Sequence, residues 1–395
     1  MNRDSRKTRS RLIVASFFGA VWLIFAGTWL GWGQFNPANE RRLLAPFPPS
    51  DASFPGGFGL YLRDHFGFRG WFVTLNALLR AEVLRTSTSP NVIIGEKGFL
   101  FFAGEGAIEN YMGLTPMTDC EVESWVDLFE RRASWLASRN IPFVMAVVPD
   151  KETIYPEMMP GSIPRRVGKS RMDRFVEAVR SRTRIALLDL RPALINVKTE
   201  HRAYYLTDTH WSPWGAYWAY REILPLIHKT APGLAAAMGP AIDRSALRFG
   251  IAYRTFDLNR MLGLNGIAPE AAETLEPVHA PVVTGGLDDP LMTSDSGDPA
   301  RPVLVFVRDS FGAALMPFLG VHFSRIYAPN GWAFNGDHVI RERPDVVVLE
   351  IVERRFNVAP PVDSGIGGAV GVRAPCQSTP ANSVSPTNAI QTLRR

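Results

Sequence analysis

VLVFVRDSFGAALMPF, residues 303–318, is a short apolar run followed by a polar turn and then a second apolar pattern with helical spacing. The apolar run from Val303 to Val307 predicts a strand covered on both faces. Only Arg308, Asp309 and Ser310 separate it from the helical pattern. A strand that passes directly into a helix is typical of a parallel sheet, and active sites of such sheets lie at the carboxyl ends of the strands.

The same alternation extends in both directions from this segment. Continuous apolar runs predict three further strands, PFVMAVVP (142–149), IALLDL (185–190) and PDVVVLEIVERRF (344–356). Thr118 with Glu121 forms a capping box, and Ser170 and Ser212-Pro213 mark two more helix starts. We therefore expect an α/β fold, a parallel sheet with helices on both faces. Residues 230–301 show weak periodicity, and NVIIGEKGFLFF (91–102) predicts a hairpin.

An uncharged apolar segment spans residues 12–32, about the 20 residues that a membrane-spanning helix needs. Five basic residues precede it, so the positive-inside rule places the N-terminus in the cytoplasm and the remainder outside. A cleaved signal peptide is the alternative, but its apolar region would be shorter. We expect an uncleaved anchor in a bacterial inner membrane and a periplasmic domain.

The composition divides the chain and excludes some classes of function. We expect a basic tail (1–11), the transmembrane helix (12–32), a linker (33–55), one catalytic domain (56–357) and a disordered tail (358–395). Much of the net charge of +5 lies before the anchor, so no nucleic-acid footprint follows from it. Cys120 and Cys376 lack metal-site spacing, and we expect both to be unpaired.

Ser310 is the first candidate for chemistry. Its place after a strand and before a helix lifts the hydroxyl above the sheet edge, and the free amides of a helix start can stabilise an oxyanion. Gly312 would permit close approach of a substrate. The competing interpretation is that Ser310 only caps the helix.

A serine nucleophile needs a base, and TDTHWSPWGAY (207–217) supplies an Asp-His pair. In an extended segment Asp208 and His210 would point the same way, so the carboxylate could orient the imidazole toward Ser310. The alternatives are a pair that anchors the loop, or a metal site completed by His201, which would lack a clear further ligand.

Weaker candidates for substrate binding lie near the same strand ends: Asp150, Lys151, Trp211 and Arg308. For the first two an ion pair or a helix cap is the structural alternative, and for Trp211 a place in the core. Glu353 and Arg354 would form a structural pair. No metal or cofactor site is expected.

Several motifs together resemble the alginate O-acetyltransferase family of AlgJ/AlgX type, which has an SGNH-hydrolase-like domain. They are RDHFGFR (63–69), IIGEKGFLFF (93–102), VVPDKETIYPE (147–157), TDTHWSPWGA (207–216), FDLNRMLGL (256–264), VRDSFG (307–312) and PDVVVLEIVER (344–354). The resemblance implies a permuted SGNH-like fold closer to the membrane-anchored AlgJ type. It also implies an acyl-enzyme on Ser310, with His210 as base and Asp208 as its acidic partner.

The resemblance further implies a polysaccharide substrate and, as acetyl donor, a multispanning membrane-bound O-acyltransferase. SGNH-type motifs usually have glycine where this chain has Arg308, which bears on the shape of the turn. Two rival functions remain open at this stage. One is a carbohydrate acetylesterase that uses the same triad, and the other is a non-catalytic protein of polysaccharide assembly or binding.

Overall fold

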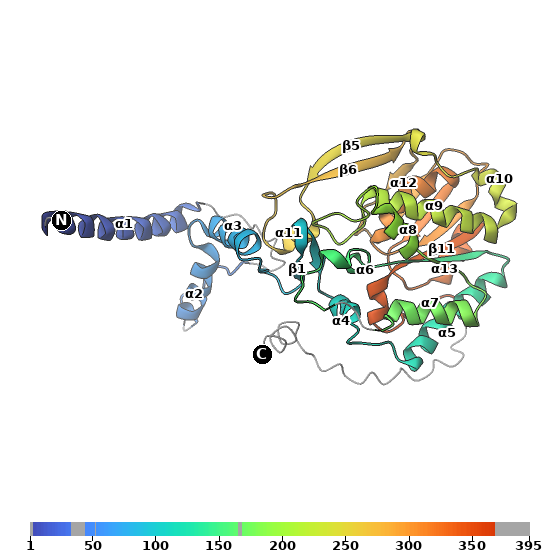
Figure 1. The fold of residues 1–395 in the computed structure, drawn as a ribbon, viewed down its shortest axis with the longest axis horizontal. Helices are drawn as coiled ribbons and strands as arrows, with labels where there is room; N and C mark the ends of the chain where they lie inside the picture. Colours follow the sequence, from blue (N-terminus) through green and yellow to red (C-terminus); the bar gives the residue numbers. More distant parts are fainter. Residues whose placement is uncertain (1–2, 33–43, 52, 165–167, 368–395) are drawn as a thin grey trace. The chain divides into compact units, whose positions relative to one another are not determined.

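The computed structural model describes residues 3–32, 44–51, 53–164 and 168–367. The chain forms two compact units, Met1–Val92 with Thr255–Pro269, and Ile93–Arg254 with Glu270–Arg395 (Figure 1). Residues 56–92 and 255–269 belong to the first unit, and the single catalytic domain expected over residues 56–357 stays a prediction.

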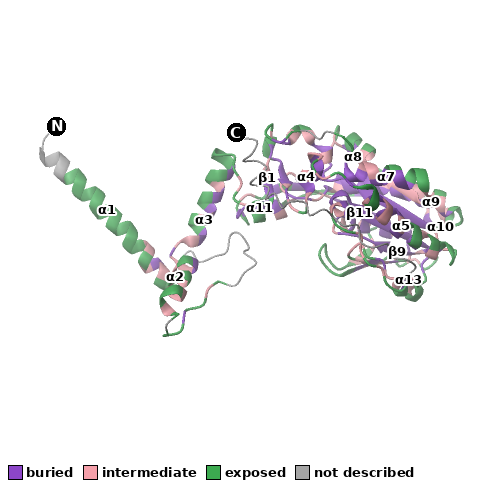
Figure 2. Cartoon of the chain, turned by 90° about the horizontal axis from the view of Figure 1, so that it is seen from below, coloured by how far each residue is buried: buried purple, intermediate pink, exposed green. Residues whose placement is uncertain are grey.

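The first unit is helical. Its elements are α1 (Arg3–Leu30), α2 (Phe54–His65), α3 (Arg69–Leu78), the π-helical turn η1 (Leu79–Val83) and α11 (Asp257–Met261). Within α1, Thr8–Leu30 is long and apolar enough to cross a membrane, with a mean hydropathy of 1.9. Most of its described side chains are exposed, as Figure 2 shows in green.

The second unit contains a seven-stranded sheet. Its order is β4 (Ala186–Asp189), β3 (Phe143–Val148), β11 (Val346–Val352), β9 (Val303–Val307), β10 (Arg325–Pro329), β8 (Leu291–Asp295) and β7 (Val282–Thr284). The first five strands are parallel, and β8 pairs antiparallel with both of its neighbours, β10 and β7. Val348 of β11 pairs with Val144 on one side and Phe306 on the other, so the three most apolar strands form the centre.

Helices cover both faces of this sheet, which confirms the expected fold class. Along β3, Val144, Ala146 and Val148 enter one apolar core, whereas Met145 and Val147 enter the other. The first core includes residues of α8 (Arg191–Val197), α9 (Pro213–Thr230) and α12 (Met316–Leu319). The second includes residues of α5 (Asp119–Ala137), α7 (Arg171–Arg182) and α13 (Gly336–Glu342). The central strands β3, β9 and β11 are almost entirely apolar because neither of their faces meets water.

The expected helix starts are present. Thr118 and Glu121 form a capping box on α5, as do Ser170 and Asp173 on α7, and Ser212 caps α9 through the Gly215 amide. β1 (Val92–Ile94) and β2 (Leu100–Phe102) form a two-stranded sheet around η2 (Glu96–Gly98), in agreement with the expected hairpin. The remaining short α-helices are α4 (Ala107–Tyr111), α6 (Lys151–Ile154) and α10 (Ala235–Met238).

Residues 230–301 contain more structure than their pattern indicated. Besides β7 and β8, they form β5 (Leu247–Arg254), which pairs antiparallel with β6 (Glu270–Pro277). Phe249, Ile251 and Tyr253 lie at alternate positions of β5 and are exposed. Apolar side chains that face solvent conceal the usual contrast between the inner and outer faces of a strand.

Two further expectations concern the termini and the cysteines. Asp363 forms an ion pair with Arg132 (2.6 Å), and the Gly336 amide donates to the Ser364 carbonyl. Ordered contacts with the second unit therefore continue beyond residue 357. Of the tail expected over residues 358–395, the part from 368 to 395 lies outside the described residues, as does most of the linker. Cys120 is disulfide-bonded, so the expectation that it is unpaired is wrong, whereas Cys376 lies outside the described residues.

Candidate active site

Ser310 lies in the turn between β9 and the short 3-10 helix η6 (Phe311–Leu315), at the carboxyl edge of the parallel strands. Its side chain makes no capping hydrogen bond. Instead the Phe311 amide donates to Oδ1 of Asp309 (2.9 Å), while Ser310 Oγ lies 2.8 Å from Nε2 of His210. The interpretation of Ser310 as only a helix cap is therefore wrong.

Asp309 and Glu350 fix this turn to the sheet. Both carboxyl groups are buried. Asp309 Oδ2 accepts from the Val352 amide (2.9 Å), and the Asp309 amide donates to Glu350 Oε2 (3.1 Å). Burial, followed by repulsion from Asp309, raises the pKa of Glu350 well above its usual value. Glu350 and Asp309 thus hold the turn through three backbone amides.

Asp208 and His210 lie in the loop between α8 and α9, closed by a bridge between Tyr204 and Trp211. Asp208 Oδ1 accepts from the His210 amide (2.8 Å) and lies 2.5 Å from His210 Nδ1. The local backbone is therefore a side-chain-bonded turn, not the expected extended segment. The turn still brings carboxylate and imidazole together, and the three side chains form one continuous hydrogen-bonded chain.

The charges of the loop favour an ionised Asp208. Burial raises the pKa of Asp208, but hydrogen bonds and charge from His210, with a smaller effect of Lys151, outweigh burial and lower the pKa. An ionised carboxylate accepts a proton-bearing Nδ1, which leaves Nε2 of a neutral imidazole free to accept from Ser310.

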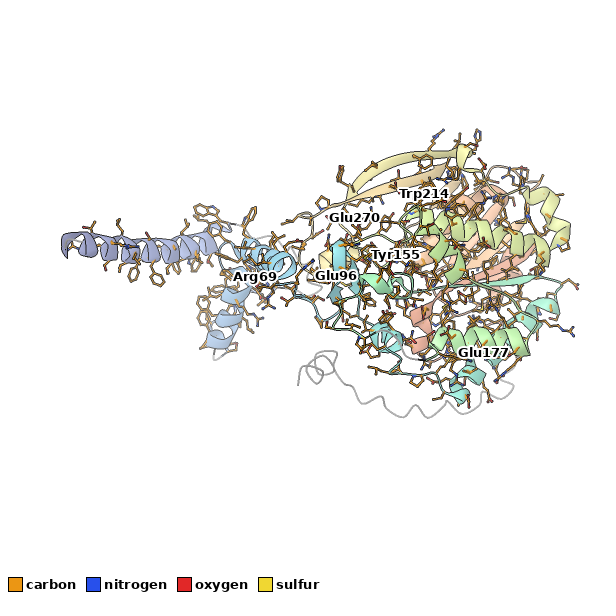
Figure 3. The ribbon with its side chains drawn as sticks, in the orientation of Figure 1. Arg69, Glu96, Tyr155, Glu177, Trp214 and Glu270 are labelled. Carbon is orange, nitrogen blue, oxygen red and sulfur yellow. The ribbon has the colours of Figure 1, made fainter. Side chains whose placement is uncertain are left out.

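Two buried residues of opposite charge hold the Asp208 loop in place. Lys151 Nζ donates to the carbonyl oxygens of Leu100 (2.6 Å), Leu206 (2.7 Å) and Asp208 (3.1 Å). Glu270, at the start of β6 (Figure 3), accepts from the Leu206 and Thr207 amides, both at 2.9 Å. It also accepts from Thr207 Oγ1 (2.8 Å) and Arg202 (3.0 Å). We call Lys151 and Glu270 the loop clamp.

The residues expected to bind substrate are instead engaged inside the protein. Lys151 belongs to the loop clamp, and Trp211 is buried, with Nε1 donating to the Phe311 carbonyl (3.1 Å). Arg308 is also buried and donates to the carbonyl oxygens of Leu287 and Asp309. All three residues are buried, and a role for them in substrate binding stays a prediction.

Asp150 is likewise buried, and its partner is Arg354 (2.6 Å). Burial raises the pKa of Asp150 even though Arg354 opposes the shift. Glu353 accepts from the Asp150 amide (3.0 Å) and Thr153 Oγ1 (2.8 Å). Glu353 and Arg354 therefore bond to residues that follow β3, and not to each other as expected. The Arg354 guanidinium lies 5.1 Å from the centroid of the Phe311 ring, which links this buried pair to the serine turn.

Gly312 and Arg308 are explained by packing. A Cβ at Gly312 would lie 2.5 Å from Arg308 Cβ and 2.9 Å from Glu350 Oε2. Gly312 therefore allows the turn to close on Arg308, and no approach of a substrate is needed to explain it. Arg308 has no left-handed backbone conformation, so this turn accommodates a side chain where related motifs have glycine.

His201 does not complete a metal site with Asp208 and His210. Its ring stacks on Trp214, with centroids 3.7 Å apart, and Nε2 lies 3.0 Å from the Arg244 guanidinium. Sequence reasoning missed Glu270, Asp309 and Glu350. Of these, only Glu350 carried a local signal, since it is a charged residue within a buried apolar strand.

A hydrogen-bonded Ser-His-Asp chain at the carboxyl edge of a mostly parallel α/β sheet defines the protein as one of hydrolase-like architecture. Residues 92–315 match the family model described as "SGNH hydrolase-like domain, acetyltransferase AlgX". Because this match covers more than half of the 395 residues, the chain belongs to the AlgX family of SGNH hydrolase-like acetyltransferases.

The chain is similar, at low sequence identity, to several other proteins. The probable alginate O-acetylase AlgJ of Pseudomonas syringae pv. tomato is 23% identical over 222 residues, 56% of this chain and 53% of the relative. The chain thus spans about half the length of that relative. The solved structure of Bacillus cereus PatB1 with a sulfonyl adduct is 13% identical, covers 67% of this chain and 94% of that one, and gives a TM-score of 0.50. The O-acetyltransferase domain of Pseudomonas putida AlgJ is 19% identical over 69% of this chain and 94% of that one, with a TM-score of 0.47.

Proposed function

We propose that the chain is a membrane-anchored O-acetyltransferase that moves an acetyl group through Ser310 onto hydroxyl groups of an exopolysaccharide such as alginate. The observation that carries the proposal is the chain of contacts from Asp208 to His210 (2.5 Å) and from His210 to Ser310 (2.8 Å). Family membership supports acetyl transfer as the reaction, and the AlgJ relative supports alginate as the substrate class.

In the first step, Ser310 Oγ attacks the carbonyl carbon of an acetyl donor while His210 Nε2 accepts the hydroxyl proton. The imidazolium that forms is stabilised by Asp208, whose carboxylate is already in contact with Nδ1. Collapse of the tetrahedral intermediate breaks the bond to the leaving group, which takes the proton from His210. The Phe311 amide is occupied by Asp309, so the Ser310 amide beside Oγ is the better candidate to stabilise the oxyanion.

In the second step, the oxygen of a sugar hydroxyl attacks the acetyl-Ser310 ester while His210 accepts the hydroxyl proton. The ester bond to Oγ breaks, the acetyl group leaves on the sugar, and the proton returns to Ser310. Water could attack the same intermediate, which would make the protein an acetylesterase. The two reactions differ only in the acceptor.

The N-terminal helix supports a proposal for the location of the reaction. A helix of this length and hydropathy serves as an anchor or as a signal peptide, and we propose an uncleaved anchor with a periplasmic second unit. The donor would then come from a multispanning membrane-bound O-acyltransferase partner, and no cofactor of this chain is proposed.

To test the proposal, purified full-length protein in detergent is incubated with p-nitrophenyl acetate as acetyl donor and mannuronate oligosaccharides as acceptor. The Ser310→Ala variant is the control. Acetylated oligosaccharide, absent with the variant, is the expected product. Free acetate alone from the unsubstituted protein would favour the esterase. If neither product exceeds that of Ser310→Ala, the non-catalytic alternative would replace the proposal.

A further inference from the structure

The helix after the anchor carries large apolar side chains on its exposed face. α3 continues through η1 as one run from Arg69 to Val83. Trp71, Leu75, Leu79 and Val83 recur every four residues and are 48% to 68% exposed. We call these four residues the outer stripe.

The buried face of the same run has only small side chains: Gly70, Thr74, Ala77 and Ala81. This order is the reverse of that in an ordinary surface helix, where the large apolar residues face the core. Figure 2 shows α3 with both buried and exposed residues. An exposed apolar stripe of this kind marks a surface that contacts a membrane or another protein.

The start of α3 is joined to the end of α1 within the first unit. The Gly67 amide donates to Thr28 Oγ1 (2.9 Å), and the Phe68 amide donates to the Trp32 carbonyl (2.8 Å). A Cβ at Gly67 would lie 2.5 Å from the Ile24 carbonyl oxygen, so glycine allows direct backbone contact with α1. Phe68 has φ 62°, which turns the chain from α2 into α3. The stripe therefore begins at the level where the apolar segment of α1 ends.

We infer that the outer stripe lies in the interfacial layer of the bilayer, on the side where α1 emerges. The inference rests on the proposed role of α1 as an uncleaved anchor. Trp71 is of the residue type enriched at membrane interfaces, and Arg69 and Arg80 lie beside the stripe, where cations meet anionic lipid head groups. The bilayer is thus the environment that matches both the apolar stripe and the flanking charge.

Photo-crosslinking of the full chain tests this placement. Benzoylphenylalanine replaces Leu75 or Leu79, and the protein is reconstituted into vesicles of phosphatidylethanolamine and phosphatidylglycerol before irradiation. Phe17 in α1 is the control for insertion of the anchor. Ile251, an apolar residue 71% exposed in the second unit, is the control matched for exposure. Lipid adducts are measured by mass spectrometry of peptides.

Adduct yields at Leu75 and Leu79 approaching that at Phe17, and at least about fivefold above that at Ile251, are expected for an interfacial helix. Adducts at Phe17 but not at Leu75 or Leu79 would overturn the inference and leave the anchor intact. Covalent dimers from Leu79 in place of lipid adducts would assign the stripe to a second copy and also overturn it. Absence of lipid adducts at Phe17 would remove the anchor, and the inference with it.

Discussion

Replacement of Asp208 by asparagine removes one charge from the proposed triad and keeps the size of the side chain. In the first step His210 becomes an imidazolium, and Asp208 Oδ1 lies 2.5 Å from its Nδ1. Two unit charges about 4 Å apart attract each other by about 4 kcal/mol at the effective dielectric constant of a protein. Lys151 Nζ, bonded to the Asp208 carbonyl, would remain as a nearby positive charge that opposes the imidazolium.

The expected result is a fall of roughly a thousandfold in the rate of acylation, since 1.36 kcal/mol corresponds to a factor of ten. The assay is single-turnover release of p-nitrophenol from p-nitrophenyl acetate by the full-length protein. Asp243→Asn is the matched control, because Asp243 also caps a turn through a backbone amide but is exposed and belongs to another loop. A rate for Asp208→Asn within about threefold of the unsubstituted protein would refute the orienting and electrostatic role of this carboxylate.

Three further predictions concern the groups that support the site. Glu270→Ala should leave the Leu206 and Thr207 amides without their acceptor. Because about 1–3 kcal/mol is lost per unsatisfied buried group, kcat should fall by about tenfold or more with little change in KM. Glu273→Ala, at an exposed position on the same strand, is the control, and equal kinetics of the two variants would contradict the role of the loop clamp. Gly312→Ala should lower stability by about 1–3 kcal/mol through overpacking, whereas Gly161→Ala, where a Cβ meets no atom within 4 Å, should not, as thermal unfolding would show. Burial, then repulsion from Asp150, raises the pKa of Glu353 from 4.5 to about 7. The stabilising contribution of Glu353 is therefore present below pH 4.5 and is lost as the pH rises through 7, which lowers the free energy of unfolding by about 3 kcal/mol. Tm should fall from pH 5 to pH 8 more steeply in the unsubstituted protein than in Glu353→Gln, and parallel curves would contradict this prediction.

The central strands and their helices could be predicted because burial on both faces leaves a plain record in the sequence. β3 and β9 read as unbroken apolar runs and β11 as a run interrupted only by Glu350, and the helix starts at Thr118, Ser170 and Ser212 carried capping residues. The β5–β6 ribbon was not foreseen, because Phe249, Ile251 and Tyr253 of β5 are apolar although they are exposed.

The proximity of Ser310 to His210 could be inferred because a strand end and a helix start meet at one edge of such a sheet. The supporting contacts could not. Glu270 contacts the Asp208 loop although it lies 62 residues after Asp208 in the sequence. Nothing in the residues around Glu270 indicates that it supports the site. Lys151 looked like a substrate contact for the same reason, since a lysine at a strand end gives no sign that three backbone carbonyl groups will surround it.

The most direct measurement is intact-mass spectrometry of the full-length protein after brief incubation with p-nitrophenyl acetate, beside the Ser310→Ala and His210→Ala variants. The account predicts a gain of one acetyl group that maps to Ser310, is absent in Ser310→Ala and is strongly slowed in His210→Ala. An unmodified Ser310, with equal ester turnover in all three proteins, would contradict the proposal that Ser310 carries the acetyl group.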